Sequence, residues 1–333
     1  MFLIQHKASM KNHSRYCRYF LLIFILLNKN LVASQSNIEC RFDEQDDNIF
    51  WIGETITGFV DFINKDKTDL KLERIDGELI GEVVAQVVEE TDAGDIETEV
   101  KEIIFNQKVL VHPRNTKGSF SVRRGKQSWP FHFQLNEDLP PSFEQKKISL
   151  VKIHYYIRFS FIRSEWYKFN IDKTCSMIVK QPGRLLSLTK LKTEKTSRNG
   201  VRLRVTFDKN VVITGNDLSF NVDLINPKGA LIRYVSIVLT EYVECNSRVK
   251  TFNIIKQDLD YIKSLKHKHI DRNFQIPIPS TTPVTFKFGD SIANYYKLHF
   301  EVHLRGMFTN IKLEVPIIVM DLIPKTNDNE DDQ

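Results

Sequence analysis

Apolar and polar residues alternate with a period of two along most of the chain after residue 36. The clearest stretch is VKIHYYIRFSFI, residues 151–162, in which every odd-numbered residue from Val151 to Phe161 is apolar. Successive side chains of a β-strand point to opposite faces, so this pattern predicts a strand with one face in a core and the other in water. GETITGFVDFIN, VRLRVTF, DLSFNVDLIN, RYVSIVLTEYV and YKLHFEVHLRG repeat the pattern, and no long segment shows a sustained helical period.

Many short strands separated by Gly, Asn, Asp and Pro turns are typical of β-sandwiches, and 333 residues are enough for two domains. We therefore predict an all-β fold of two immunoglobulin-like β-sandwich domains in tandem, over residues 37–181 and 199–323. Residues 182–198 open with Pro-Gly, continue rich in Lys, Thr and Ser, and are expected to be a linker. Residues 324–333 are expected to be an acidic disordered tail, and residues 85–100 a solvated acidic loop.

Residues 1–36 are expected to be a leader or an unstructured extension, and they contain an apolar run from Tyr19 to Leu27. A basic flank, a short apolar run and small residues near Ala33 have the layout of a secretory signal peptide. Two observations argue against secretion. Beyond residue 36 the chain has three cysteines, Cys40, Cys175 and Cys245, an odd count from which we expect no disulfide framework, and it has no Asn-x-Ser/Thr sequon. A cleaved signal, a membrane anchor and a mis-assigned start all stay open.

Charge and motifs exclude several functional classes. The net charge of +5 comes entirely from residues 1–36, and from residue 37 onward 42 basic residues face 42 acidic ones, so we expect no nucleic-acid partner. The sequence has no Gly-rich phosphate loop, no Cys-x-x-Cys and no His-Glu-x-x-His. Gly289-Asp290-Ser291 is interpreted as a turn, and His267 with His269 as part of a solvated basic stretch. We therefore expect no catalytic, cofactor-binding or metal-binding residues, no cofactor and no enzymatic activity.

The stretch SWPFHFQLNEDLPPSFEQ, residues 128–145, combines alternating aromatics with a double proline. Trp129, Phe131 and Phe133 alternate and are expected in a core. Pro130 between them cannot donate a backbone hydrogen bond and therefore needs an edge strand or a bulge. The segment Pro140–Phe143 is interpreted as chain punctuation that ends the strand, with Phe143 closing the end of the sandwich, rather than as a ligand for a partner domain.

These residues resemble the arrestin family, and the resemblance covers roughly residues 37–323. It is carried by the following residues: Ile52 to Gly58, Gly77 to Gly81, Gly125, Trp129-Pro130-Phe131 with Phe133, Leu139 to Glu144, Tyr156-Ile157-Arg158, FQIPIPSTTPVTF (residues 274–286) and Val315-Pro316-Ile317. The chain departs from the family pattern at Ile52, Asn136, Gly215-Asn216-Asp217 and Met320. Asn and Asp tolerate turn conformations, so we expect the turns to survive. Within the family, the chain is similar to a divergent alpha-arrestin, an arrestin-domain-containing protein, because its length fits that branch and no clathrin-binding tail follows Ile323.

The resemblance implies that the protein is an adaptor that acts in the cytoplasm, at the plasma membrane or at endosomes. Such a protein binds the cytoplasmic tails of membrane receptors or transporters and supports their endocytosis, endosomal sorting and protein transport, and peripheral membrane association fits this role. Many alpha-arrestins recruit ubiquitin ligases with WW domains through Pro-Pro-x-Tyr, but this chain lacks that motif. We therefore expect contacts with other arrestins or with ligase machinery by another route. The alternative is a secreted or lumenal β-sandwich binding module directed by the N-terminal apolar segment.

A basic binding face is expected on the first domain, where residues 103–183 carry 14 basic against 5 acidic residues. Arg158 matches the family's lysine in its Tyr-x-Val-Lys-Ala strand, and strand alternation puts Lys152 and His154 on the same outward face. Arginine binds carboxylate or phosphate in a bidentate manner, so this face suits acidic or phosphorylated tails. Arg123, Arg124 and Lys126 lie in an expected turn and are weaker candidates.

Overall fold

The computed structural model of the chain describes residues 37–43, 48–91, 94–112, 118–144, 151–165, 167–182, 190–198, 200–246, 248–259, 269–305 and 310–321. The extension 1–36 and the acidic tail 324–333 lie outside these residues. All regular elements in the described part are strands, which confirms the all-β prediction. No helix found there has the length and apolar character needed to cross a membrane.

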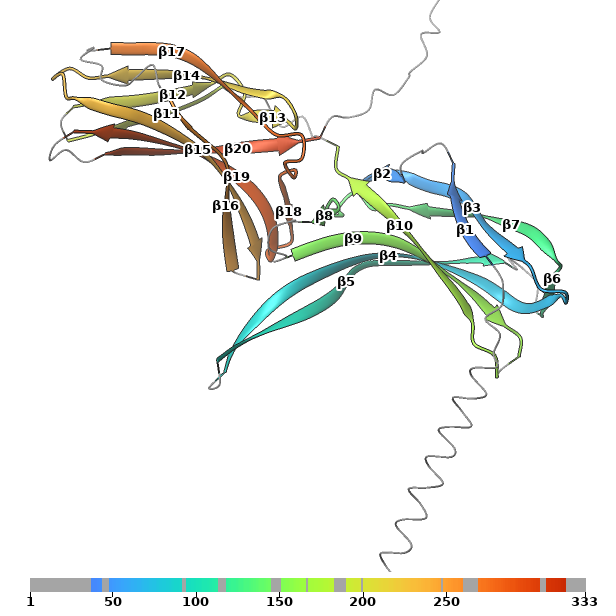
Figure 1. Cartoon of the computed structure of the whole chain (residues 1–333). Coiled ribbons are helices and arrows are strands. Elements are labelled where there is room, and N and C mark those ends of the chain that lie inside the picture. The colour runs from blue at the N-terminus through green and yellow to red at the C-terminus, as the bar shows by residue number, and fades with distance from the viewer. Residues whose placement is uncertain are drawn as a thin grey trace, which may run out of the picture.

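The first domain is a sandwich of two sheets (Figure 1). Its strands are β1 (Asn37–Phe42), β2 (Ile49–Trp51), β3 (Thr55–Asn64), β4 (Leu70–Thr91), β5 (Gly94–His112), β6 (Phe120–Val122), β7 (Gly125–Gln134), β8 (Phe143–Glu144), β9 (Val151–Arg163) and β10 (Ile171–Lys180). One sheet has the order β1-β3-β7, and the other has the order β2-β10-β9-β4-β5, with β6 on β4 and β8 on β9.

The second domain repeats this plan, and two tandem sandwiches are present as predicted. Its strands are β11 (Leu191–Thr196), β12 (Arg202–Phe207), β13 (Val211–Ile213), β14 (Asp217–Ile225), β15 (Ile232–Cys245), β16 (Arg248–Asp258), β17 (His269–Pro277), β18 (Phe286–Phe288), β19 (Ile292–Leu304) and β20 (Ile311–Met320). One sheet has the order β11-β12-β14-β17, and the other has the order β13-β20-β19-β15-β16, with β18 on β19. In both domains a short strand pairs in parallel with the domain's last strand, β2 with β10 and β13 with β20.

The alternating apolar residues form the cores, as their period predicts. All six odd-numbered residues of β9 from Val151 to Phe161 are buried, and so are Trp129, Phe131 and Phe133 of β7. β7 is an edge strand, so Pro130 needs no partner for the N–H that it lacks. Each large side chain of this kind contributes about 1.5–3 kcal/mol by burial, and the two sets of buried residues form one core in each domain.

The two domains build the end of the sandwich in the same way. In the first, the Tyr155 hydroxyl donates to the Pro140 carbonyl at 2.7 Å. In the second, the Tyr296 hydroxyl donates to the Pro283 carbonyl, also at 2.7 Å. Burial raises the pKa of both tyrosines, because it disfavours the phenolate, so both stay protonated donors.

The residues after these prolines repeat as well. Ser142 donates its N–H to the Val179 carbonyl at 2.7 Å and accepts the Val179 N–H at its hydroxyl at 2.9 Å. Thr285 makes the same pair of hydrogen bonds with Val319, at 2.8 and 3.0 Å. Phe143 follows Ser142, Phe286 follows Thr285, and the two rings touch across the domain boundary with centroids 5.4 Å apart. The expected end plug Phe143 therefore also joins the two domains.

The acidic segment 85–100 is not a loop, and that expectation is wrong. β4 and β5 pair antiparallel up to Thr91 and Gly94, so the segment is the end of a long hairpin. Figure 1 shows this hairpin projecting past the other sheet of its domain. The part of the hairpin that extends past the other sheet has no sheet to pack against and needs no apolar face. For that reason its sequence is polar and resembles that of a loop.

Two further expectations need correction. The interval 182–198, expected to be a linker, contains β11, which pairs with β12 over six residue pairs as an edge strand of the second domain. Cys40 and Cys175 form a disulfide with Cα atoms 6.3 Å apart, although the cysteine count argued against one. It joins β1 in one sheet to β10 in the other, whereas Cys245 is a buried free thiol.

Candidate functional site

The expected basic residues of β9 share one face, as strand alternation predicts. Lys152, His154 and Arg158 all point away from the core, and each is half-buried or exposed. The neighbouring strand β4 sets what they meet, because Glu78 lies directly opposite Arg158 and Glu82 directly opposite His154. We call these outward residues of β9 and β4 the β9 face.

Glu78 is the centre of the β9 face. Its carboxylate accepts a short hydrogen bond from the Arg158 guanidinium and one from Asn106 at 2.8 Å, and it pairs with the Lys108 ammonium at 3.3 Å. Burial acts to raise the pKa of this carboxyl, but the hydrogen bonds from Arg158, Asn106 and Lys108 outweigh it and hold the pKa of Glu78 below its ordinary value. The ionised carboxylate in turn raises the pKa of Arg158. Arg158 is therefore already engaged by an internal anion.

A second carboxylate, Glu82, lies opposite His154 on the same face. The Glu82 carboxylate lies 3.3 Å from His154 Nε2 and accepts a hydrogen bond from the Tyr156 hydroxyl at 3.2 Å. The His154 and Tyr156 rings stack with centroids 5.7 Å apart. At the end of the strand, the Lys152 ammonium lies 2.9 Å from Glu144 Oε1. All three expected basic residues thus face an acidic partner.

The surface beside Arg158 is hollowed. A depression of about 600 Å³ is lined by Arg158 and Ser160 of β9, Glu78 of β4, Lys108 of β5 and Asp172 of β10. Its residues carry charge of both signs, so the β9 face is a lattice of cross-strand ion pairs rather than a uniformly basic surface. A phosphate or carboxylate of a ligand would bind here by replacing Glu78 as the ion-pair partner of Arg158 and Lys108.

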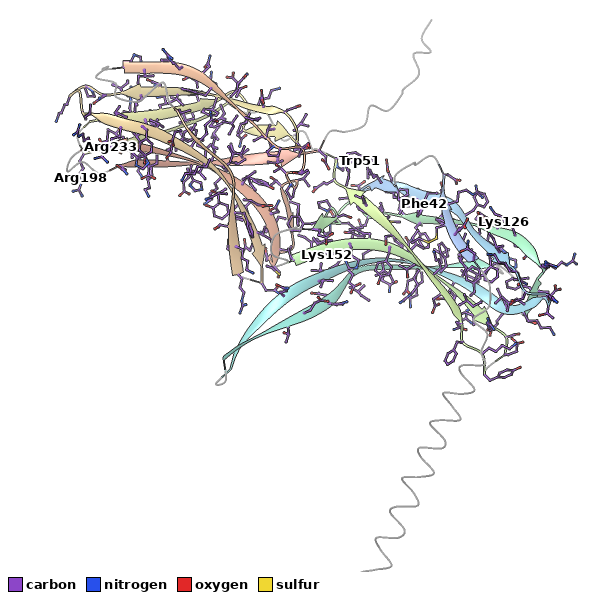
Figure 2. All side chains as sticks on the ribbon, in the orientation of Figure 1. Phe42, Trp51, Lys126, Lys152, Arg198 and Arg233 are labelled. Atoms are coloured by element: carbon purple, nitrogen blue, oxygen red, sulfur yellow. A yellow bond between two sulfur atoms is a disulfide. The ribbon has the colours of Figure 1, made fainter. Side chains whose placement is uncertain are left out.

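The weaker candidates lie elsewhere. Arg123 and Arg124 occupy the exposed turn between β6 and β7, and Lys126 is the second residue of β7. Figure 2 shows Lys126 and Lys152 at opposite ends of the first domain. Lys126 pairs at 2.8 Å with the buried carboxylate of Asp61 on β3. The structure therefore does not join these three residues to the β9 face.

The second domain has a polar face that sequence reasoning missed. A depression of about 980 Å³ lies over the sheet β11-β12-β14-β17. Arg204 on β12 reaches Glu194 at 2.9 Å and Asp223 at 3.4 Å, and Asn221 donates to Asp271 at 2.8 Å. The outward Arg, Asn and Asp residues of VRLRVTF and DLSFNVDLIN were the signal for this face.

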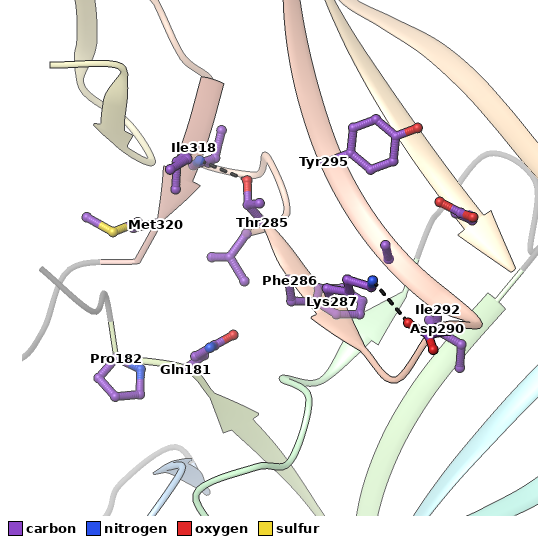
Figure 3. A pocket seen from close by; sticks show the side chains of 14 residues that line it. Gln181, Pro182, Thr285, Phe286, Lys287, Asp290, Ile292, Tyr295, Ile318 and Met320 are labelled. Atoms are coloured by element: carbon purple, nitrogen blue, oxygen red, sulfur yellow. Dashed lines mark hydrogen bonds and ion pairs between the residues drawn. The ribbon is translucent and has the colours of Figure 1, made fainter. Parts of the chain in front are cut away.

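Figure 3 shows a pocket where the connector after β10 meets the second domain. It has a volume of about 480 Å³, and its lining includes Pro182, Phe286, Ile318 and Met320. On its rim the Lys287 ammonium pairs with Asp290 at 3.2 Å. Gln181 and Pro182 line it together with residues of the second domain, so the pocket lies at the junction between the connector and that domain.

Residues set aside in the sequence also have clear positions. Gly289 has a φ of 56° and forms the turn between β18 and β19. His269 pairs with Asp223 at 2.8 Å, whereas His267 lies outside the described residues. No group of three or more His, Cys, Asp or Glu side chains in the described ranges is arranged to hold a metal ion.

The comparisons with known proteins agree with the architecture. Residues 38–182 match the family model described as arrestin (or S-antigen), N-terminal domain. Residues 197–324 match the model described as arrestin (or S-antigen), C-terminal domain. The two matches together span well over half of the chain. Comparison with curated proteins gives no match.

Proposed function

The chain belongs to the arrestin family, and from that premise we propose that it is a non-enzymatic adaptor of the alpha-arrestin branch, an arrestin-domain-containing protein. In this role it binds the cytoplasmic tails of membrane receptors or transporters and supports their endocytosis and endosomal sorting. Its place of action is the cytoplasm, at the plasma membrane or at endosomes. The observation that carries this proposal is the presence of both arrestin domains in tandem, each with a polar outward sheet face.

The β9 face is the proposed cargo site. Arg158 and Lys108 share Glu78, so a phosphorylated or acidic tail competes with an internal carboxylate for the same guanidinium and ammonium. A dianionic phosphate accepts more charge-assisted hydrogen bonds than one carboxylate. Binding is therefore expected to favour phosphorylated over unphosphorylated tails and to weaken as salt concentration rises.

The test uses the full chain and fluorescent peptides from receptor tails, with and without phosphoserine. The double variant Arg158→Glu with Lys152→Glu should bind phosphorylated peptides at least about tenfold more weakly, because each charge-assisted hydrogen bond contributes about 1.5–3 kcal/mol. The matched control Lys195→Glu with Lys312→Glu puts the same charge change on exposed positions of the second domain. Unchanged binding in a folded double variant would refute the proposed site. The adaptor role predicts that a fluorescently tagged receptor internalises more slowly when the chain is depleted. An unchanged rate of internalisation would refute this role.

The alternative function has one observation in its favour. The disulfide between Cys40 and Cys175 is typical of proteins in oxidising compartments, so it supports a secreted or lumenal binding module. A reporter fused after Gln333 separates the two functions. If the protein is a cytoplasmic adaptor, the fusion protein should be uncleaved, should lie in the cytoplasm and should have reduced cysteines. The alternative predicts a cleaved leader, a lumenal or extracellular reporter, and a Cys40–Cys175 peptide linked by a disulfide in mass spectra.

A further inference from the structure

Several turns of the first domain meet at the end farthest from the second domain. Pairing between strands brings them together: Lys126 lies opposite Ile63, Ser121 opposite Lys71, and Leu72 opposite Arg163. We define this end, residues 61–71, 121–126 and 163–170 without residue 166, as the distal tip.

Hydrogen bonds hold the turns of the distal tip in place. The buried Asn64 side chain donates to the Val122 carbonyl at 3.0 Å and to the Thr68 carbonyl at 3.2 Å, which joins two of the turns. The Arg163 N–H donates to the Asn170 side chain at 3.2 Å, which closes the third turn. The distal tip is therefore an ordered surface rather than a set of independent loops.

The distal tip is strongly basic. It contains eight basic residues against four acidic ones: Lys65, Lys67, Lys71, Arg123, Arg124, Lys126, Arg163 and Lys168 against Asp61, Asp66, Asp69 and Glu165. Asp61 is buried and already paired with Lys126 and, at 3.5 Å, with Arg41 on β1. Five of the eight basic residues are exposed without a carboxylate partner among the described ion pairs, and they lie in the β3–β4 turn, at the start of β4 and in the β6–β7 turn: Lys65, Lys67, Lys71, Arg123 and Arg124.

Two aromatic rings project from the same end. Tyr167 is 63% and Phe169 is 67% exposed, and both lie in the turn between β9 and β10. The Lys168 ammonium lies 5.8 Å from the centre of the Tyr167 ring. Exposed aromatic rings beside basic side chains are typical of surfaces that enter the headgroup region of a membrane, where the ring meets hydrocarbon and the cation meets phosphate.

The chain also enters the first domain at this end. β1 begins at Asn37, which pairs with Ile63 of the distal tip. The sequence before Asn37 contains the apolar run Tyr19–Leu27 between Arg18 and Lys29. An apolar run with basic flanks has the composition of a segment that binds lipid, as do the exposed aromatics beside basic side chains.

We propose that the distal tip docks the protein onto an anionic membrane, with Tyr167 and Phe169 in the headgroup region and the exposed lysines and arginines against lipid phosphates. A membrane fits better than an acidic protein because the two exposed rings need an apolar medium, which a highly charged partner does not supply. This inference goes beyond the cargo-binding role and does not depend on it, since the distal tip and the β9 face are separate surfaces.

The test is flotation of the full chain with phosphatidylcholine vesicles, with and without phosphatidylserine. Wild type should bind vesicles that contain phosphatidylserine and should be released by salt. The variants Tyr167→Ser with Phe169→Ser and Arg123→Glu with Arg124→Glu should each bind about tenfold more weakly. Two control variants should bind as wild type: Val249→Ser, an exposed apolar residue of β16, and Lys195→Glu with Lys312→Glu.

Three results would overturn the proposal, once thermal melts show that the variants are folded. The first is vesicle binding without dependence on phosphatidylserine. The second is unchanged binding in both distal-tip variants, which would assign any vesicle binding to another part of the chain. The third is no vesicle binding together with strong binding to polyglutamate, which would make the distal tip a site for an acidic protein.

Discussion

Single residues already show how the cores depend on strand alternation. Trp129 is 9% exposed, and its ring lies 6.0 Å from Phe161 and 6.3 Å from Phe120, centroid to centroid. Trp129→Ala should lower the free energy of unfolding by about 3–5 kcal/mol, because a large cavity is left in the core. Urea unfolding measures this loss. Trp51→Ala is the matched control, since Trp51 is only half-buried, and equal losses in both variants would contradict the assigned orientation of β7.

Asp61 links stability to pH. Burial acts to raise its pKa, but Lys126, Ser128 and Arg41 outweigh burial, so the pKa of Asp61 lies below its ordinary value of 3.8. A lowered folded-state pKa gives stability that is present above the unfolded-state pKa and is lost as pH falls through the folded-state pKa. The free energy of unfolding should therefore drop below about pH 4, and it should drop less in Asp61→Asn.

Urea midpoints between neutral pH and pH 2 measure this difference. The control is Asp290→Asn, which removes a fully exposed carboxylate instead of a buried one. A steep acid loss that survives intact in Asp61→Asn would show that other carboxylates are responsible.

At the scale of the strand, the segment Pro140–Phe143 is part of the fold. Pro140, Pro141 and Phe143 are buried, and Ser142 is fixed to Val179 by two hydrogen bonds. These contacts confirm that the segment is part of the fold, but it does not end a strand as expected, because β7 already ends at Gln134 and β8 begins at Phe143. WW domains bind exposed, extended proline segments. A pull-down of the full chain with isolated WW domains should therefore capture nothing above background, and micromolar binding lost in a folded Phe143→Ala variant would contradict this expectation.

The sequence predicted the strands and which side chains share a face, but not which residues on neighbouring strands lie opposite those side chains. Alternation along residues 151–162 was enough to place Lys152, His154 and Arg158 on one outward face, since orientation depends only on local period. Glu78 and Glu82 lie opposite these residues through a register set between distant segments, and no local pattern encodes that register. For this reason the sequence predicted a basic face, whereas in the structure the same basic residues form ion pairs with carboxylates.

The disulfide escaped prediction for the same reason. Cys40 and Cys175 are separated by 135 residues and meet only because β1 and β10 belong to facing sheets. Its reduction should destabilise the first domain by about 2–4 kcal/mol, because the cross-link restricts the unfolded chain. Urea unfolding with and without reductant measures the effect. The double variant Cys40→Ser with Cys175→Ser should match the reduced wild type and should not respond to reductant.

At the scale of the whole molecule, the repeat of one sandwich plan sets how the domains meet. Phe143 and Phe286 hold equivalent places in the two domains and pack against each other. Val243, Cys245 and Ile292 of the second domain join the first domain's core cluster. A more peripheral contact joins the Lys180 ammonium to Asp321 at 3.7 Å. The apolar contact is therefore continuous with a core, whereas the ion pair lies at its partly exposed margin.

An interface of this kind should couple the unfolding of the two domains. Phe286→Ala removes one of the two equivalent rings. It should weaken the interaction between the domains by about 3–5 kcal/mol, because the loss of a buried aromatic ring leaves a cavity. Calorimetry should then resolve two unfolding transitions where wild type shows one, since domains with a weakened interface unfold separately. Lys180→Ala is the control and should keep a single transition, because a partly exposed ion pair contributes only about 0–1 kcal/mol. Two transitions in the wild type itself would show that the domains are already independent and that the paired rings do not couple them.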